Sequence, residues 1–276
     1  MIKAIFFDID GTLISIRKHK IPESTLKAVA AVRGKGVLTF LCTSRAVQFL
    51  SNIPGIGYDG LVCLTGAHCL DKDHKDIHCH GMDPEDVAAA VIDCQRRDEP
   101  IIALASDRIY VHNPMHPAVM NALATGGLKP GDVAGGFQPF PDLDNASNPV
   151  DVVSRFGILQ MTGFFHSGEE EDRMMSLMPD SHTERWTEAF VDIIGNGASK
   201  ALGLEVMAEH FGFSLEETMA IGDGANDIPM IRRAGVGVAM GNASAEVKAA
   251  ANHVTDDVDE DGLAKALAKY FPDLSY

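Results

Sequence analysis

The stretch FFDIDGT, residues 6–12, closes a short apolar run that begins at residue 2. An apolar run of this length that ends at a carboxylate is typical of a buried parallel strand. Gly11 breaks the pattern and permits a tight turn, which would bring the carboxylates of Asp8 and Asp10 to one centre. Because ligands bind at the carboxyl ends of strands in an open parallel sheet, this stretch predicts a site there.

Apolar and amphipathic segments alternate on both sides of a long middle region. The first part predicts strands at 2–7, 37–42 and 60–64, with helices at 23–34 and 46–52. The alternation resumes at Ser199, which can cap a helix, and continues through a strand at 218–221 to a terminal helix from residue 262. Strands that alternate with helices predict a parallel sheet covered on both faces.

The middle region has a different order of elements. It predicts hairpins at 101–112 and 182–194, a strand at 157–164, a helix after Gly168 and a loop over 126–150. This order is typical of an α+β insertion. We therefore predict an α/β fold, in which residues 1–81 and 189–276 form a Rossmann-like parallel-sheet core and residues 82–188 form an inserted α+β domain.

Further polar residues follow the other core strands at the same predicted edge. They are Thr43, Ser44 and Arg45 after the second strand, Lys200 at the start of a helix, and Asp223, Asn226 and Asp227 after the strand near residue 220. A lone DxD or GDGxND occurs by chance in many chains. All of these motifs in order, each where the fold puts a ligand, favour a functional site.

Together these four motifs resemble those of the haloacid dehalogenase (HAD) superfamily. The large insertion between the second and third motifs resembles the Cof-type subfamily, which carries a type IIB cap there, and within it the hexose-phosphate phosphatases. The resemblance spans essentially the whole chain. It implies a magnesium-dependent phosphatase that hydrolyses small phosphorylated metabolites, such as sugar phosphates, through an aspartyl-phosphate intermediate, with the insertion as a cap that decides substrate specificity.

Each of these residues has a chemical task in phosphoryl transfer. Asp8 would attack the phosphoryl group, and Asp10 would protonate the leaving alkoxide and then deprotonate the hydrolytic water. Thr43 and the backbone N–H of Ser44 can bind phosphoryl oxygens, while Lys200 offsets the clustered acids and binds phosphate. Dehalogenases of the superfamily lack the second acid, so Asp10 favours phosphoryl transfer.

The same carboxylates predict a metal site. Asp8, the main-chain carbonyl of Asp10 and Asp223 are hard oxygen ligands that suit Mg²⁺. Asp227 would hold a metal-bound water or add a direct ligand. Asn226 would orient the neighbouring aspartates and bind the phosphate.

The composition of the insertion bears on the substrate. Residues 82–188 contain seven basic and eighteen acidic side chains, a formal charge of about −11. A cap that binds a second phosphate would more naturally be basic, so we favour a substrate whose distal end is uncharged, such as a hexose phosphate. Candidate substrate contacts are Arg45, Thr65, Arg185 and Trp186; Thr65 stands where many relatives have asparagine.

Bulk properties exclude several classes of partner. The net charge of −16 argues against nucleic acids and anionic membranes, and no apolar run reaches the roughly 20 residues of a membrane helix. The first apolar run meets a carboxylate too soon for a signal peptide, so we expect a cytoplasmic protein, a monomer or weak homo-oligomer. Five cysteines without framework spacing are expected to be reduced, and the His/Cys segment 68–80 favours a hairpin over a zinc site.

Other functions remain open from the sequence. Within enzymes they are a pyridoxal-phosphate or nucleotide phosphatase and a phosphomannomutase-like phosphotransferase. From a different class, the chain could be a phosphosugar-binding regulator without turnover, although the complete set of motif residues argues against it.

Overall fold

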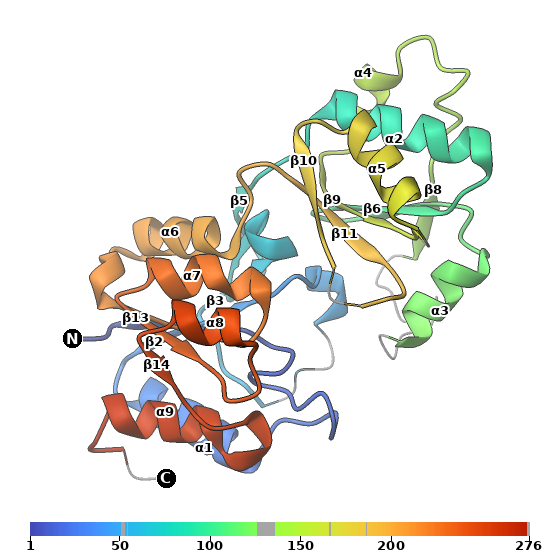
Figure 1. The fold of residues 1–276 in the computed structure, drawn as a ribbon. Coiled ribbons are helices and arrows are strands. Elements are labelled where there is room, and N and C mark those ends of the chain that lie inside the picture. Colours follow the sequence, from blue (N-terminus) through green and yellow to red (C-terminus); the bar gives the residue numbers. More distant parts are fainter. Residues whose placement is uncertain (51–52, 54, 126–135, 166, 186, 275–276) are drawn as a thin grey trace. The chain divides into compact units, whose positions relative to one another are not determined.

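The computed structural model in Figure 1 describes residues 1–274 apart from 51–52, 54, 126–135, 166 and 186. The chain divides into two compact units. The larger unit contains residues 1–78 and 199–276, and the smaller unit contains residues 79–198. Each unit has its own sheet and its own hydrophobic core.

The larger unit is built on a sheet with the strand order β14-β13-β12-β1-β2-β3-β4-β5. The strands from β14 to β3 run parallel, and β4 is antiparallel to β3. Its strands are β1 (Ala4–Phe7), β2 (Leu38–Cys42), β3 (Gly60–Cys63), β4 (His68–Asp71), β5 (Asp76–Cys79), β12 (Thr218–Gly222), β13 (Val236–Ala239) and β14 (His253–Val254). Its helices are α1 (Glu23–Gly34), α6 (Lys200–Phe211), α7 (Ile228–Arg233), α8 (Ala245–Ala250) and α9 (Gly262–Tyr270).

The central strands of this sheet are apolar because helices cover both faces. All four residues of β1 are buried. Phe6 on β1 stacks on Phe40 of β2 with ring centroids 4.7 Å apart, and Leu204 and Met207 of α6 join the same cluster. Helices α6 and α7 lie on one face, whereas α1 and α9 lie on the other and contact each other (Figure 1). The predicted Rossmann-like parallel core is therefore confirmed.

The strand order creates a switch point beside β1. The chain passes from β1 to β2 and β3 on one side, and it later returns to place β12 on the other side of β1. Phe7 pairs with Ile221 in the β1–β12 register. The loops that follow these two strands consequently leave the same edge of the sheet as neighbours, which is where α/β folds bind ligands.

The smaller unit has a second sheet with the order β10-β11-β9-β6-β7-β8. Its strands are β6 (Ile101–Ala105), β7 (Ile109–His112), β8 (Phe137–Pro139), β9 (Ile158–Gly163), β10 (Ser181–Glu184) and β11 (Val191–Gly195). Its helices are α2 (Pro84–Arg97), α3 (Pro117–Thr125), α4 (Pro149–Ser154) and α5 (Gly168–Leu177). This composition confirms the α+β character that the sequence predicts for the insertion.

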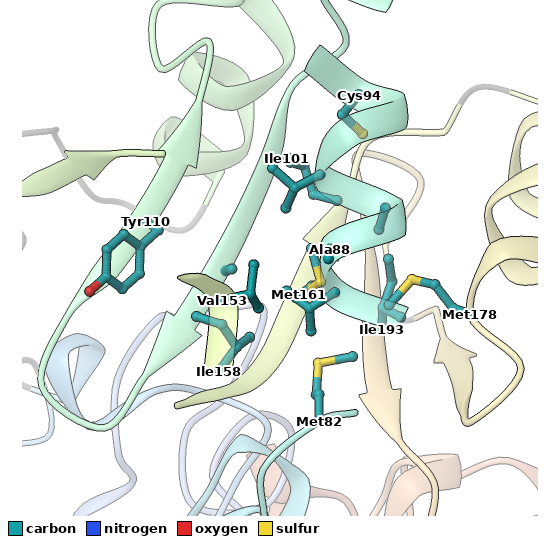
Figure 2. Close-up of a cluster of buried hydrophobic side chains, with 14 of the residues drawn as sticks. Met82, Ala88, Cys94, Ile101, Tyr110, Val153, Ile158, Met161, Met178 and Ile193 are labelled. Atoms are coloured by element: carbon teal, nitrogen blue, oxygen red, sulfur yellow. The ribbon is translucent and has the colours of Figure 1, made fainter. Parts of the chain in front are cut away.

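The core of the smaller unit lies between this sheet and helix α2. Figure 2 shows Ala88 and Cys94 of α2 facing Ile101, Met161 and Ile193, which come from three different strands. Asp83 begins α2 by accepting a hydrogen bond from the Glu85 N–H at 2.7 Å, with Pro84 in the first turn. Helix α2 buries its apolar face against the sheet. The strand residues that face α2 are therefore apolar.

Several boundaries differ from the sequence prediction. Residues 79–81 and 189–198 belong to the smaller unit, not to the core, and strand β11 in the second of these segments pairs with β9 and β10 in the smaller sheet. The helix expected at 46–52 is a single 3-10 turn, Val47–Phe49, and residues 51–52 lie outside the described part of the chain. This turn buries none of its side chains, so no packing extends it into a helix.

One further local prediction agrees with the structure and another differs from it. The segment 68–80 contains the expected hairpin of β4 and β5, and His68 pairs with Asp76 across it at 2.7 Å. The loop expected over 126–150 differs from the structure, which has the short strand β8 at Phe137–Pro139 and begins α4 at Pro149; residues 126–135 lie outside the described residues.

We expect Ile193→Ala to lower the stability of the smaller unit by about 2–5 kcal/mol, because it leaves a cavity between β11, β9 and α2. Native-state hydrogen exchange is the measurement. Amides of β6 and β9 should exchange faster in the variant, while those of β2 should not. Val150→Ala, at a side chain that is 37% exposed in the same unit, is the matched control. Faster exchange in β2 alone would place β11 with the core instead.

Candidate active site

The ammonium group of Lys200 is the centre of a buried charge cluster in the larger unit. Its Nζ lies 2.7 Å from Oδ1 of Asp8 and 2.5 Å from Oδ1 of Asp227, and the lysine is 0% exposed. Ser199 caps α6 through the Leu202 N–H at 3.1 Å, and this cap places Lys200 in the first turn. The structure thus brings together the first, third and fourth sequence motifs.

Asp227 also fixes the loop that follows β12. Its Oδ2 accepts hydrogen bonds from the backbone N–H groups of Asp223 and Gly224, both at 2.9 Å. Because its other oxygen accepts from Lys200, both oxygens of this fully buried carboxylate are engaged. Asp227 is therefore suited to hold Lys200 and the loop in place.

Asp223 lies directly against the turn that follows β1. Its Oδ1 accepts a hydrogen bond from Oγ1 of Thr12 at 3.0 Å, and its Oδ2 accepts from Nδ2 of Asn242 at 3.0 Å. Gly11 has a φ of +92°, and a Cβ atom at this position would lie 2.2 Å from Asp223 Oδ2. Glycine is required at residue 11 both by its backbone conformation and by this close approach.

Burial and repulsion by neighbouring carboxylates raise the pKa values of Asp8 and Asp223. Burial raises the pKa of Asp8 well above its usual range, Asp227 raises it further, and Lys200 opposes the shift. Burial and then Asp227 raise the pKa of Asp223 to about 6. Burial lowers the pKa of Lys200, but the carboxylates of Asp227 and Asp8 outweigh this and raise it, so the ammonium stays charged.

The donor set of the cluster fits a hard divalent cation. Asp8, Asp223 and Asp227 each offer a carboxylate oxygen, and these oxygens lie within 4.8 Å of one another. When all three are ionised, the single charge of Lys200 leaves the cluster with a net charge of −2. At a separation of 4.8 Å two carboxylates repel each other by about 3.5 kcal/mol for an effective dielectric constant near 20, and a divalent cation would offset this repulsion.

Arg45 engages Asp10 through both carboxylate oxygens. Its Nε lies 2.8 Å from Oδ2 and its Nη2 lies 2.5 Å from Oδ1, a bidentate arrangement that fixes the carboxylate plane. The Arg45 backbone N–H donates to Oγ1 of Thr43 at 3.1 Å. The sequence indicates Arg45 as a candidate substrate contact only because it lies next to Thr43. Its ion pair with Asp10, between the loops after β1 and β2, is found only in the structure.

Thr65 occupies a strained turn beside Thr43. Its N–H donates to the Thr43 carbonyl at 3.1 Å. Leu64, Thr65 and Gly66 have φ values of +49°, +51° and +91°, and such values are outliers for a β-branched residue. The Thr65 hydroxyl is buried and has no hydrogen-bond partner among the described residues. Thr65 therefore carries a strained backbone and an uncompensated hydroxyl, each at a cost of about 1–3 kcal/mol.

The remaining predicted site residues lie in different places. Ser44 is half-buried in the loop after β2, and Asn226 is half-buried in the 3-10 turn Ala225–Asp227. Arg185 belongs to the smaller unit, where it pairs with Glu171 at 2.7 Å. Trp186 lies outside the described residues. The residue that sequence reasoning missed is Asn242, in the segment Met240-Gly241-Asn242, which has the composition of an ordinary turn.

Comparison with known proteins agrees with this geometry. The family model of the haloacid dehalogenase-like hydrolases matches residues 5–267. The solved HAD subclass IIB sugar phosphatase BT4131 superposes with a TM-score of 0.81 at 35% identity, covering 98% of this chain and 99% of its own. Among the described residues, every helix is too short or too polar to cross a lipid bilayer.

Two curated relatives match along almost their whole length. YkrA of Bacillus subtilis is 31% identical over 266 residues, which cover 96% of both chains. The pyridoxal phosphate phosphatase YbhA of Escherichia coli is 28% identical over 271 residues, which cover 95% of this chain and 96% of YbhA. The chain belongs to the haloacid dehalogenase-like hydrolases, and it is a phosphatase of that family.

Proposed function

We propose that this chain is a Mg²⁺-dependent phosphatase that hydrolyses sugar phosphates, with hexose phosphates as the leading class, through an aspartyl-phosphate on Asp8. The observation that carries this proposal is the buried Lys200 ammonium between Asp8 and Asp227. A phosphoryl group carries up to two negative charges, and a carboxylate can attack it only where positive charge offsets this repulsion.

In the first half of the reaction, Asp8 attacks phosphorus. Lys200 binds Oδ1 of Asp8, so we assign Oδ2 as the attacking oxygen. A P–O bond forms to Asp8 while the bond to the sugar oxygen breaks, and Asp10 gives that oxygen its proton. Thr43 and the Ser44 N–H bind phosphoryl oxygens in this assignment.

In the second half, Asp10 takes a proton from a water molecule. That water attacks the phosphorus of the aspartyl-phosphate, inorganic phosphate leaves and the Asp8 carboxylate is restored. Arg45 holds Asp10 by both oxygens, so we assign Arg45 to the positioning of this acid–base residue. Bound Mg²⁺ would be held by Asp8, the Asp10 carbonyl and Asp223, and it would supply positive charge to the phosphoryl oxygens.

The smaller unit supports a substrate with an uncharged distal end. Residues 79–198 contain nineteen acidic and seven basic side chains. Each arginine of the unit forms an ion pair with a nearby acid, and Lys129 lies outside the described residues. A second phosphate would need a free cation there. The sugar phosphatase activity of the similar BT4131 points the same way.

A phosphate-release screen tests the substrate class. The panel should contain hexose and pentose phosphates, nucleotides and pyridoxal 5′-phosphate, which is included because the similar YbhA acts on it. We expect the highest kcat/KM among the hexose phosphates. Preferential turnover of pyridoxal phosphate would replace this assignment, and transfer of phosphate within a sugar with need for a bisphosphate activator would identify a mutase.

We expect Asp8→Asn to lower phosphate release by about 10³-fold or more, because an amide is a poor nucleophile at phosphorus. The measurement is steady-state turnover with saturating Mg²⁺ on the best substrate of the screen. Asp73→Asn, at an acid that is 73% exposed in the β4–β5 turn, removes the same charge from the same unit and should retain wild-type turnover. Full turnover by Asp8→Asn would exclude the covalent mechanism.

We expect Mg²⁺ to raise the melting temperature, because it relieves the repulsion among Asp8, Asp223 and Asp227. At ten times its Kd the cation contributes about 1.4 kcal/mol, which corresponds to a few degrees. Thermal melts should be recorded at constant ionic strength adjusted with NaCl. The shift should be absent in Asp223→Asn and intact in Asp73→Asn. An equal shift in both variants would place the metal elsewhere.

A further inference from the structure

Asn242 makes three hydrogen bonds to three separate loops of the larger unit. Its Nδ2 donates to the Gly11 carbonyl at 2.9 Å and to Oδ2 of Asp223 at 3.0 Å. Its Oδ1 accepts from the Val258 backbone N–H at 3.0 Å. A backbone N–H can only donate, so the oxygen of this amide must face Val258 and its two N–H groups must face Gly11 and Asp223.

These bonds connect the loops of four neighbouring strands. Gly11 follows β1, Asp223 follows β12, Asn242 itself follows β13, and Val258 follows β14. The four strands are adjacent in the sheet in the order β14-β13-β12-β1. A single amide therefore spans the edge of the sheet from β1 to β14 and holds the turn of the first motif against the loop of the fourth.

The Asp223 carboxylate receives one donor on each oxygen, from Thr12 on Oδ1 and from Asn242 on Oδ2. One donor on each oxygen opposes rotation of this carboxylate about its χ2 torsion. Groups that hydrogen-bond a ligating carboxylate in this way set its orientation, and their loss lowers metal affinity by about 10–100-fold in known sites.

The backbone of the Asn242 loop does not depend on its side chain. The Met240 N–H donates to the Gly222 carbonyl at 3.0 Å, and the Gly241 N–H donates to the Asp256 carbonyl at 2.9 Å. These bonds anchor the loop to β12 on one side and to the segment after β14 on the other. Removal of the side chain should consequently release Asp223 and Gly11 while the loop stays in place.

We propose that Asn242 is a positioning residue that orients the Asp223 carboxylate and the Gly11 turn for metal binding. This role rests on the metal site of the proposed function. Asn242 acts through Asp223, because its amide contributes neither an attacking group nor a proton to phosphoryl transfer. The Gly11 carbonyl bond extends the effect to the turn that carries Asp10.

Calorimetric titration of the substrate-free protein with Mg²⁺ tests this role. We expect Asn242→Ala to raise the Kd for Mg²⁺ about 10-fold or more. Asn242→Ser, which keeps a polar group at this exposed position, should show the same change and serves if the alanine variant unfolds. The matched control is Asn252→Ala, which removes a side-chain bond to the Gly237 N–H in the same unit and should leave the Kd unchanged.

The outcomes separate this role from the others. A lower melting temperature with a Kd within twofold of wild type would make Asn242 a purely structural residue and overturn the inference. Wild-type protein that takes up no Mg²⁺ would overturn both the metal site and this role. Wild-type protein that binds Mg²⁺ but releases no phosphate from any compound of the screen would refute only the proposed function, since the titration needs no substrate.

Discussion

The pairing of Lys200 with Asp8 and Asp227 is the constraint on which the rest of the larger unit depends. An isolated buried carboxylate is expensive, and a buried pair loses several kcal/mol of solvation per ion that only good geometry restores. One ammonium serves two acids here and leaves the third, Asp223, to be held by neutral donors. The cluster thus keeps a surplus of negative charge, which is a cost in the absence of a cation and the source of its affinity for one.

The sheet topology makes this cluster possible. Asp8 and Asp223 follow adjacent parallel strands at the same edge of the sheet. The strand pairing alone therefore brings these two residues together, although they lie far apart in the chain. Small residues at the turns permit this approach, and at Gly11 the carboxylate of Asp223 occupies the volume of a side chain. Thr65, after the neighbouring strand β3, adopts a positive φ, and its hydroxyl is unpaired among the described residues.

Much of this site could be predicted from the sequence, because polar residues that end apolar runs mark the edge of a parallel sheet. This pattern identifies Asp8, Thr43 and Asp223. Ser199 indicates the start of the helix whose first turn contains Lys200. The hydrogen-bond partner of a side chain is harder to predict. The guanidinium of Arg45 binds Asp10 and the amide of Asn242 binds Asp223, and each pair joins loops whose proximity follows only from the strand order. The sequence prediction places strand β11 in the core for the same reason, since a hairpin pattern does not reveal which sheet the strand joins.

The register of β1 against β12 has a consequence for synthesis of the chain. Ala4 pairs with Thr218 and Phe7 with Ile221, although β2 follows β1 within a few dozen residues. On the ribosome, the β12 side of β1 therefore has no partner until the entire smaller unit and helix α6 have emerged. A central strand then presents unpaired N–H and C=O groups, as an edge strand does. The entropic cost of closing so long a loop grows only with the logarithm of its length. The long separation therefore adds little to the free energy of pairing β1 with β12, but it lengthens the time for which β1 is exposed during synthesis.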